Sequence, residues 1–337
     1  MISYHSVRAG YPKVGKTPEN FVRIGFMRVL LIGGCGFIGS HIADCLLAAG
    51  ISVRVLDKRP EAFRPPLDRV EYVLGDIQDT SLLSESAENM DAIVHLASTT
   101  VPTTANLDPV ADVTGNLISM LRLLEALRGR PLRKFVFLSS GGTVYGVPDR
   151  VPIPEEHALR PINSYGITKV AIENFLFMEH RQHGLQNLIL RASNPYGPRQ
   201  FHTGAQGIIG THLWRVAQGQ APEVWGDGSV VRDFIHVRDL AQLCYAALVS
   251  DYTGCLNAGS GKGTAIIDLV ADIQRVVAAT GHGEVTPVFK PGRSIDVPRV
   301  VLDIGKARQL LGWQPRIGLT EGLEETWAWV RGQAGAT

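Results

Sequence analysis

The chain has 337 residues, of which 45% are hydrophobic and 19% charged, and its formal net charge is +1. This length allows one large core, or a nucleotide-binding lobe with a smaller substrate lobe. The near balance of charge argues against a general affinity for nucleic acid or anionic membranes. No apolar run approaches the roughly 18 residues of a membrane span, so we expect neither nucleic acid nor membrane as a partner.

The cysteines and histidines give no sign of a metal site. The four cysteines form no CxxC pair and no metal-ligand spacing, and the histidines are scattered. We therefore expect reduced thiols, a cytoplasmic protein and no bound metal. Residues 1–26 carry four basic side chains against one acid and lack the apolar run of a signal peptide. We expect a disordered tail or a native start at Met27, and favour the native start.

Residues 28–42 have the pattern of a buried strand, a glycine-rich turn and a helix. The run 29–32 is apolar throughout, as in a strand covered on both faces of a parallel sheet. Glycines follow at 33, 34, 36 and 39, and apolar residues then return at helical spacing. Such a turn lets the backbone approach a pyrophosphate at the N-terminus of a helix. The pattern predicts a dinucleotide site contacted by Gly33, Gly36, Phe37, Ile38 and Gly39.

An acidic residue at the end of the next strand favours NAD as the dinucleotide. The predicted strand 52–56 ends in Asp57, 18 residues after Gly39. An acid there accepts hydrogen bonds from the adenosine ribose and repels a 2′-phosphate. Lys58 and Arg59 follow it directly, so NADP remains an alternative, and Lys58 is a further candidate cofactor contact.

Further short strands are predicted at 70–74, 93–98 and 135–138, and a long helix at 112–127. This alternation predicts a doubly wound parallel sheet, with ligands beyond the carboxyl ends of its strands. Residues at or just after those ends add candidate cofactor contacts: Asp76, Ile77, Leu96, Ala97, Ser98 and Ser139. Ala192, later in the chain, is a further candidate cofactor contact.

A tyrosine and a lysine in the next predicted helix, 164–180, are the candidate catalytic pair. Tyr165 and Lys169 are four residues apart and therefore lie on one helix face. An ammonium beside a phenol lowers the pKa of the phenol, so that phenolate becomes available as a base. A YxxxK pattern alone is usually a solvated helix face, but here it follows a complete dinucleotide fingerprint.

These motifs together resemble the extended short-chain dehydrogenases/reductases, specifically the nucleotide-sugar epimerases typified by UDP-galactose 4-epimerase. The resemblance runs from about residue 27 to residue 330. It implies a doubly wound Rossmann-type sheet with a smaller C-terminal α/β substrate lobe. The functional positions that it carries over are Gly33, Gly36, Gly39, Asp57, Asp76, Ile77, Asn116, Tyr165 and Lys169.

The second half of the chain resembles the family's substrate-binding segments. Asn194 in RASNPYGPR corresponds to a sugar-diphosphate contact, and Trp225 and Arg232 begin and end WGDGSVVR, which holds the base and the diphosphate. Arg293 and Asp296 in PGRSIDVP correspond to a second diphosphate arginine and a ribose-binding acid. Two guanidinium groups on one diphosphate are chemically reasonable, because each binds phosphate oxygens bidentately. Three capped helices are predicted here, at 268–280, 303–311 and 320–330, whereas GSGKGT at 259–264 is predicted to be a turn and not a phosphate loop.

The chain departs from the family pattern at Gly141, where relatives place a Ser or Thr that binds the sugar 4′-oxygen. Thr143 or Ser140 could supply the hydroxyl instead, and we favour Thr143. Sugar dehydratases carry an acidic pair directly after that Ser or Thr, and its absence here argues against elimination of water. Val300 replaces a bulkier residue of strict glucose/galactose epimerases, which predicts room for an N-acetylated sugar.

By resemblance, we expect an NAD-dependent enzyme that interconverts a UDP-hexose and its C4 epimer through a 4-keto intermediate. A UDP-uronate epimerase or a nucleotide-sugar reductase of the same fold is the alternative, and a non-catalytic NAD-binding regulator is a remote one. The expected organisation is an NAD-binding domain at 27–193 and a mainly substrate-binding lobe at 194–330. Part of 227–256 is expected to pack back on the first domain, and a homodimer is expected by resemblance alone.

Overall fold

The computed structural model describes residues 27–201, 207–283, 286–292 and 297–334. Its larger part is built on a seven-stranded sheet of β1 (Arg28–Ile32), β2 (Ser52–Asp57), β3 (Val70–Leu74), β4 (Ala92–His95), β5 (Lys134–Ser140), β6 (Asn187–Ala192) and β10 (Gly254–Ala258). The strand order is β10-β6-β5-β4-β1-β2-β3, and every neighbouring pair is parallel. The predicted doubly wound sheet is confirmed.

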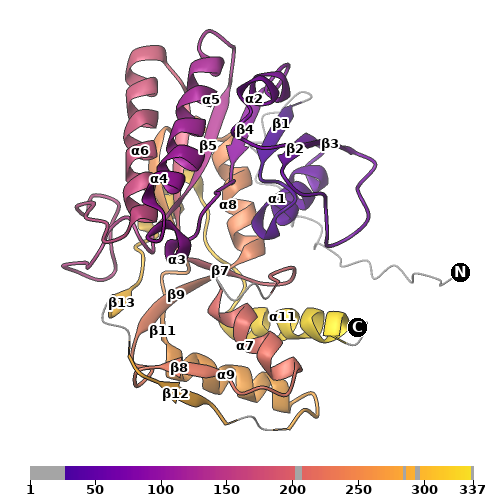
Figure 1. Cartoon of the computed structure of the whole chain (residues 1–337), viewed down its shortest axis with the longest axis vertical. Helices are drawn as coiled ribbons and strands as arrows, with labels where there is room; N and C mark the ends of the chain where they lie inside the picture. The colour runs from indigo at the N-terminus through magenta and orange to yellow at the C-terminus, as the bar shows by residue number, and fades with distance from the viewer. Residues whose placement is uncertain (1–26, 202–206, 284–285, 293–296, 335–337) are drawn as a thin grey trace, which may run out of the picture.

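Helices cover both faces of this sheet (Figure 1). One face carries α1 (Phe37–Ala48) and α8 (Val237–Val249), and the other carries α2 (Thr80–Ser86), α5 (Ser119–Leu127) and α6 (Ser164–His183). Side chains alternate along each strand, so Leu31 packs in the first layer and Leu30 in the second. Because both faces are buried, the strands are apolar at nearly every position.

The helix predicted at 112–127 is not a single α-helix. The segment consists of α4 (Pro109–Asp112), a π-helical turn η1 (Val113–Ile118) and α5, and a short helix α3 (Pro102–Ala105) precedes it. Asn116 lies within the π turn, and its amide donates to the carboxylate and the carbonyl of Asp112 at 2.9 and 3.1 Å. Such turns insert one residue into an α-helix and concentrate at functional sites.

The smaller lobe lies below the sheet in Figure 1. Its elements are β7 (Asn194–Tyr196), α7 (Ile208–Ala217), β8 (Glu223–Trp225), β9 (Val231–His236), β11 (Gly263–Ala265), α9 (Ile266–Ala278), β12 (Val288–Lys290), β13 (Arg299–Val300) and α11 (Leu319–Ala334). Helix α10 (Gly305–Leu311) instead packs against β10 of the large sheet, where Ala307 joins the core. Strands β11, β9 and β13 form a sheet to which β7 adds by pairing with β9, and β12 pairs with β8. Helices α7, α9 and α11 enclose a separate apolar core.

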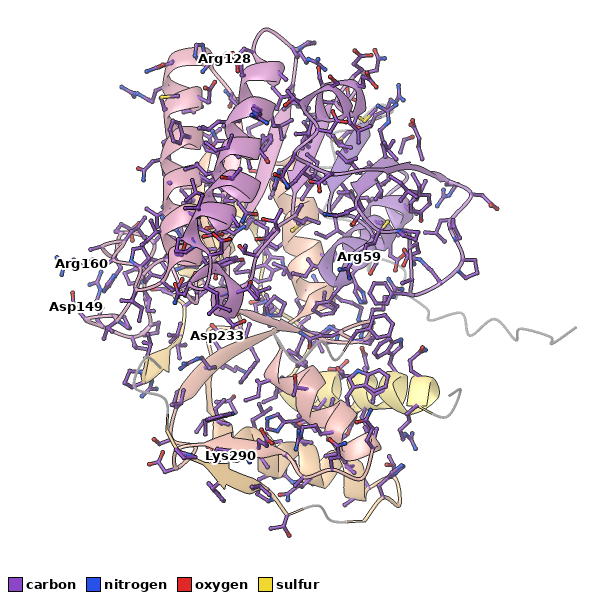
Figure 2. All side chains as sticks on the ribbon, viewed as in Figure 1. Arg59, Arg128, Asp149, Arg160, Asp233 and Lys290 are labelled. Atoms are coloured by element: carbon purple, nitrogen blue, oxygen red, sulfur yellow. The ribbon has the colours of Figure 1, made fainter. Side chains whose placement is uncertain are left out.

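Two expectations for this lobe have different outcomes. The predicted turn is limited to residues 259–262, because Gly263 and Thr264 begin β11. The Ser260 and Gly261 amides donate to the Asp233 carboxylate at 2.7 and 3.2 Å. Figure 2 shows Asp233 near the junction of the two parts of the molecule, far from Lys290. The expected side-chain cap is wrong for α9, since Ala265 precedes this helix without a capping hydrogen bond. Ile304 precedes α10, but the predicted residue Asp303 accepts the Gly305 amide of its first turn at 2.8 Å.

The two halves of the sequence are not separate in space. Strand β10 completes the large sheet beside β6, and α8 packs against α1.

Within the described residues, no helix combines the length and the apolar character needed to cross a membrane. The four cysteines are buried and unpaired.

Candidate active site

A cavity of about 570 Å³ lies between the carboxyl ends of the large sheet and the smaller lobe. Both parts of the molecule contribute to its wall. The candidate residues that line it are Phe37, Ile38, Leu96, Ser98, Ser139, Ser140, Thr143, Tyr165, Lys169, Ala192, Asn194, Trp225 and Arg232. Residues chosen from distant parts of the sequence thus meet at one site.

Tyr165 and Lys169 lie in the first two turns of α6, whose start is capped by Asn163 through a 2.8 Å hydrogen bond to the Gly166 amide. The Lys169 ammonium lies 5.5 Å from the centre of the Tyr165 ring and 4.6 Å from that of Phe137. It also donates to the Leu138 carbonyl at 3.1 Å. The pair therefore projects from the helix toward the end of β5.

Burial sets the protonation of this pair, and it opposes the sequence-based expectation. Burial raises the pKa of Tyr165 to about 12, the charge of Asp112 adds to this, and a hydrogen bond with Ser98 lowers it. Burial also lowers the pKa of Lys169 to about 8, against the charges of Glu173 and Asp112. The predicted lowering of the tyrosine pKa is thus wrong for the protein without ligands. Removal of the phenol from water raises its pKa by more than the nearby ammonium lowers it.

The hydroxyl groups after β5 have distinct surroundings. Ser139 donates to the buried Glu173 carboxylate, which is paired with Arg191, so this serine is held by the protein itself. Ser140 and Thr143 both line the cavity, and the Thr143 hydroxyl is 3.5 Å from the Ser140 carbonyl. Gly141 is buried, and a Cβ there would lie 2.6 Å from a Leu302 methyl and 2.9 Å from the Arg191 carbonyl. The family's usual hydroxyl therefore has no space at this position.

The glycine turn has the shape that a dinucleotide pyrophosphate needs. Gly33 has φ +88°, a left-handed conformation that favours glycine. A Cβ on Gly39 would lie 2.4 Å from the Gly33 carbonyl, so glycine lets the helix pack closely on the turn. A Cβ on Gly36 would meet only that carbonyl within 4 Å, at 3.4 Å, and this side of the turn is open.

The acids at the ends of β2 and β3 also fit NAD. Asp57 accepts the Cys35 and Arg59 amides at 3.0 and 3.1 Å, and a carboxylate has further acceptor positions for ribose hydroxyls. Lys58 pairs with Asp76 at 2.9 Å. Its ammonium therefore already has a carboxylate partner, whereas a 2′-phosphate of NADP would need a cation here. Hydrogen bonds from Gln78 and Lys58 lower the pKa of Asp76.

Two candidate cofactor contacts point elsewhere. The Ile77 side chain packs in the core layer between the large sheet and helices α2, α5 and α6. Asn116 is buried behind the cavity loop, where its carbonyl oxygen accepts the Thr99 amide at 2.8 Å and its amide donates to Thr100 and Asp112. Neither side chain lines the cavity, so a direct side-chain contact of either residue with a cofactor stays a prediction.

The substrate side of the cavity is partly described. The Asn194 amide donates to the Asp233 carbonyl at 2.8 Å, and Arg232 donates to the Val297 carbonyl at 2.6 Å. Arg293 and Asp296 lie outside the described residues. Val300 is buried in an apolar cluster with Leu302 and does not line the cavity, so its proposed effect on sugar size stays a prediction.

The sequence analysis missed two residues of the cavity wall that carry a buried polar atom without a partner. Ser193 and Gln200 are 8% and 9% exposed, and the Ser193 hydroxyl and the Gln200 carbonyl oxygen have no hydrogen-bond partner in the described structure. Ser193 directly precedes Asn194 in the RASNPYGPR motif, so the motif itself could have indicated it. No motif in the sequence indicates Gln200.

Among the described residues, no group of three or more His, Cys, Asp or Glu side chains is arranged to hold a metal ion.

Comparisons with known proteins agree with this geometry. The model of the NAD dependent epimerase/dehydratase family matches residues 29–259. The UDP-glucose 4-epimerase of Mycolicibacterium smegmatis is 35% identical over 316 residues, covering 91% of this chain and all of that protein. The crystal structure of UDP-glucose 4-epimerase from Thermotoga maritima with UDP-glucose superposes with a TM-score of 0.86 at 33% identity, covering 91% of this chain and 99% of the other. The UDP-N-acetylglucosamine 4-epimerase of Methanobrevibacter ruminantium in complex with UDP-N-acetylmuramic acid gives the same TM-score at 27% identity, with the same coverage.

Proposed function

The chain belongs to the NAD-dependent epimerase/dehydratase family, and we propose that it interconverts a UDP-hexose and its C4 epimer. The observation that carries the proposal is one cavity wall shared by Tyr165, Lys169, Thr143 and Arg232. These are the residues to which we assign the base, the cation, the sugar-orienting hydroxyl and the phosphate-binding group, and the cavity that they line also includes Phe37 and Ile38 of α1.

In this reaction Tyr165 acts as the base. Its phenolate removes the proton of the sugar 4-hydroxyl and returns it when the 4-keto intermediate is reduced. Bound NAD would supply the hydride acceptor for C4 of the sugar and the donor for its return, so that oxidation and reduction would cancel. Lys169 supplies positive charge next to the phenol, and Thr143, or Ser140 as the alternative, orients the 4-oxygen.

The two ends of the substrate are held by different elements. We assign the diphosphate to Arg232, Arg293 and Asn194, and the base and ribose to Trp225 and Asp296. A substrate held at its diphosphate can turn its sugar within the cavity, so that hydride returns to the opposite face. Val300 is buried away from the cavity, so it does not distinguish a plain hexose from an N-acetylated one. Assays with a panel of UDP-sugars distinguish them.

The rival activities differ in their redox balance. A reductase would consume reduced cofactor stoichiometrically, whereas an epimerase leaves the cofactor unchanged. The test is incubation of the purified protein with UDP-glucose or UDP-N-acetylglucosamine, while the products and the absorbance of reduced nicotinamide are followed. Formation of the C4 epimer without net change in reduced nicotinamide supports the proposal, and stoichiometric oxidation of added NADH would replace it with a reductase.

A homodimer in the cytoplasm is the proposed state of the protein. Leu107, Val110, Ile162 and Ile167 are 84%, 76%, 53% and 55% exposed. They belong to α4, α6 and the segments next to them, and these two helices are in contact. Exposed apolar side chains on neighbouring elements favour association of two copies of the chain.

We divide the chain into an NAD-binding part, 27–193 with part of 227–256, and a substrate lobe, mainly 194–330.

A further inference from the structure

Asp112 is a buried carboxylate that the reaction as described does not use. Its exposed fraction is 0%, and within the described part of the chain no Lys or Arg forms an ion pair with it. It accepts hydrogen bonds from Thr100, Ser164, Thr168 and Asn116 at 2.5, 2.7, 2.8 and 2.9 Å. Burial would raise the pKa of Asp112, but these hydrogen bonds outweigh it and lower the pKa. The carboxylate is therefore ionised at neutral pH.

Three of the four donors to Asp112 come from two segments that surround Tyr165, and the fourth, Asn116, comes from the π turn. Ser164 and Thr168 flank the tyrosine on α6, whereas Thr100 belongs to the loop after β4 that lines the cavity. In the same loop, Ser98 bonds to the Thr100 carbonyl at 2.9 Å and also hydrogen-bonds Tyr165. Asp112 is thus tied to two side chains that flank Tyr165 on α6 and, through Thr100, to the loop whose Ser98 contacts the tyrosine hydroxyl.

The charge of Asp112 acts on the catalytic pair as well. It raises the pKa of both Tyr165 and Lys169. The other titratable groups around the pair lie on α6 and on β4 to β6. Glu173 is paired with Arg191 at 2.6 Å, and burial lowers the pKa of His95 to about 3, which leaves this histidine neutral.

We propose that Asp112 is a positioning residue, which aligns Tyr165 with the 98–101 loop and favours a cationic ligand in the cavity through its negative charge. The inference rests on the proposed function, since oxidised nicotinamide is cationic and reduced nicotinamide is neutral. The four hydrogen bonds outweigh the cost of burying this carboxylate. The experiments therefore separate the effect of its charge on a ligand from the effect of its hydrogen bonds on the fold.

Replacement of Asp112 by Asn removes the charge and keeps the shape, because hydroxyl neighbours can rotate to accept as well as donate. The matched control is Asp108→Asn, four residues earlier, where the side chain is exposed and caps α4 by accepting the Ala111 amide. Asparagine caps a helix as well as aspartate does. We expect the acidic limb of the kcat/KM profile to move down by about one pH unit in Asp112→Asn and to stay in place in Asp108→Asn.

The second measurement does not depend on turnover. The ratio of the Kd values for NAD⁺ and NADH is determined by competition on cofactor-depleted protein. We expect Asp112→Asn to weaken NAD⁺ relative to NADH by about tenfold, the equivalent of one pKa unit. An unmoved acidic limb together with an unchanged ratio would overturn the proposal, even if the activity fell.

Further variants guard against loss of folding and against failure of the proposed function. If Asp112→Asn does not fold, Thr168→Val withdraws one donor and retains the charge. We expect a several-fold fall in kcat with KM unchanged and recovery in Thr168→Ser, whereas a wild-type kcat in Thr168→Val would contradict the positioning role. If the wild type converts no UDP-sugar, the proposed function fails, and the NAD⁺/NADH ratio alone decides the role of Asp112.

Discussion

The Lys169 ammonium lies 5.5 Å from the centre of the Tyr165 ring, one helical turn away. The lysine is buried beside the end of β5, and the tyrosine is half-buried. Burial raises the pKa of the tyrosine to about 12 and lowers the pKa of the lysine to about 8. The protein without ligands therefore holds a neutral phenol next to a lysine that loses its proton readily. A positive charge brought by a ligand would favour the phenolate.

Replacement of Tyr165 by Phe removes the proposed base and keeps the ring. We expect kcat to fall by about 10² to 10⁴-fold, with the NAD content of the purified protein unchanged. The comparison is Tyr72→Phe, which removes a hydroxyl on the edge strand β3, where it accepts the Leu67 amide. Equal turnover in Tyr165→Phe and the wild type would exclude the assigned base.

Thr143 and Ser140 are distinguished by single substitutions. We expect Thr143→Ala to lower kcat by about 10²-fold and Thr143→Ser to retain most of it, because the hydroxyl is kept. Ser140→Ala should cost less. Steady-state kinetics on the best UDP-sugar decides, and a larger loss in Ser140→Ala would transfer the role to that serine.

Restoring a hydroxyl at residue 141 should harm the protein. A side chain there meets Leu302 and the Arg191 carbonyl, so we expect Gly141→Ser to lose about 1 to 3 kcal/mol of stability. Gly142→Ser is the control, because a Cβ at Gly142 has nothing within 4 Å. Thermal denaturation measures both, and a Gly141→Ser variant with wild-type Tm and higher activity would show that the site tolerates the usual family residue.

The stability of the cofactor-free protein should depend on pH through Lys169. Its pKa falls from the ordinary 10.5 to about 8 on folding, so between these values the unfolded chain holds more protons than the folded one. Stability must then rise with pH across this window, by at most about 1.4 kcal/mol per pH unit, and the penalty of the buried charge is complete below it. We expect the free energy of unfolding of the wild type to increase relative to Lys169→Met between pH 8 and pH 10.5. Urea titrations at several pH values measure this difference, and a difference that does not change with pH would contradict the buried ammonium.

The sequence predicted the large sheet closely. Strands β2 and β3 begin at the expected residues because buried parallel strands are continuous apolar runs bounded by polar loops. The glycine turn and the Tyr165/Lys169 pair were found because their chemistry fixes residue type and spacing. Both signals are local, so one sequence is enough to reveal them.

The features that the sequence missed depend on tertiary contacts. The π turn that contains Asn116 is accompanied by hydrogen bonds to Asp112, and an apolar periodicity does not distinguish it from an α-helix. The raised pKa of Tyr165 results from burial by segments distant in sequence. Likewise, the lack of space at Gly141 is due to Leu302, which follows it by 161 residues.

The most direct test of the epimerase proposal is proton NMR of the purified protein with a panel of UDP-sugars in deuterated buffer. We predict that the C4 epimer of one sugar appears, with no deuterium in the ring and no NAD added, because the hydride removed from C4 returns to the same carbon. Deuterium in the ring would indicate enolisation next to a keto group, and the C4-epimerase proposal would then be abandoned. No conversion of any sugar, even with added NAD, would also contradict it.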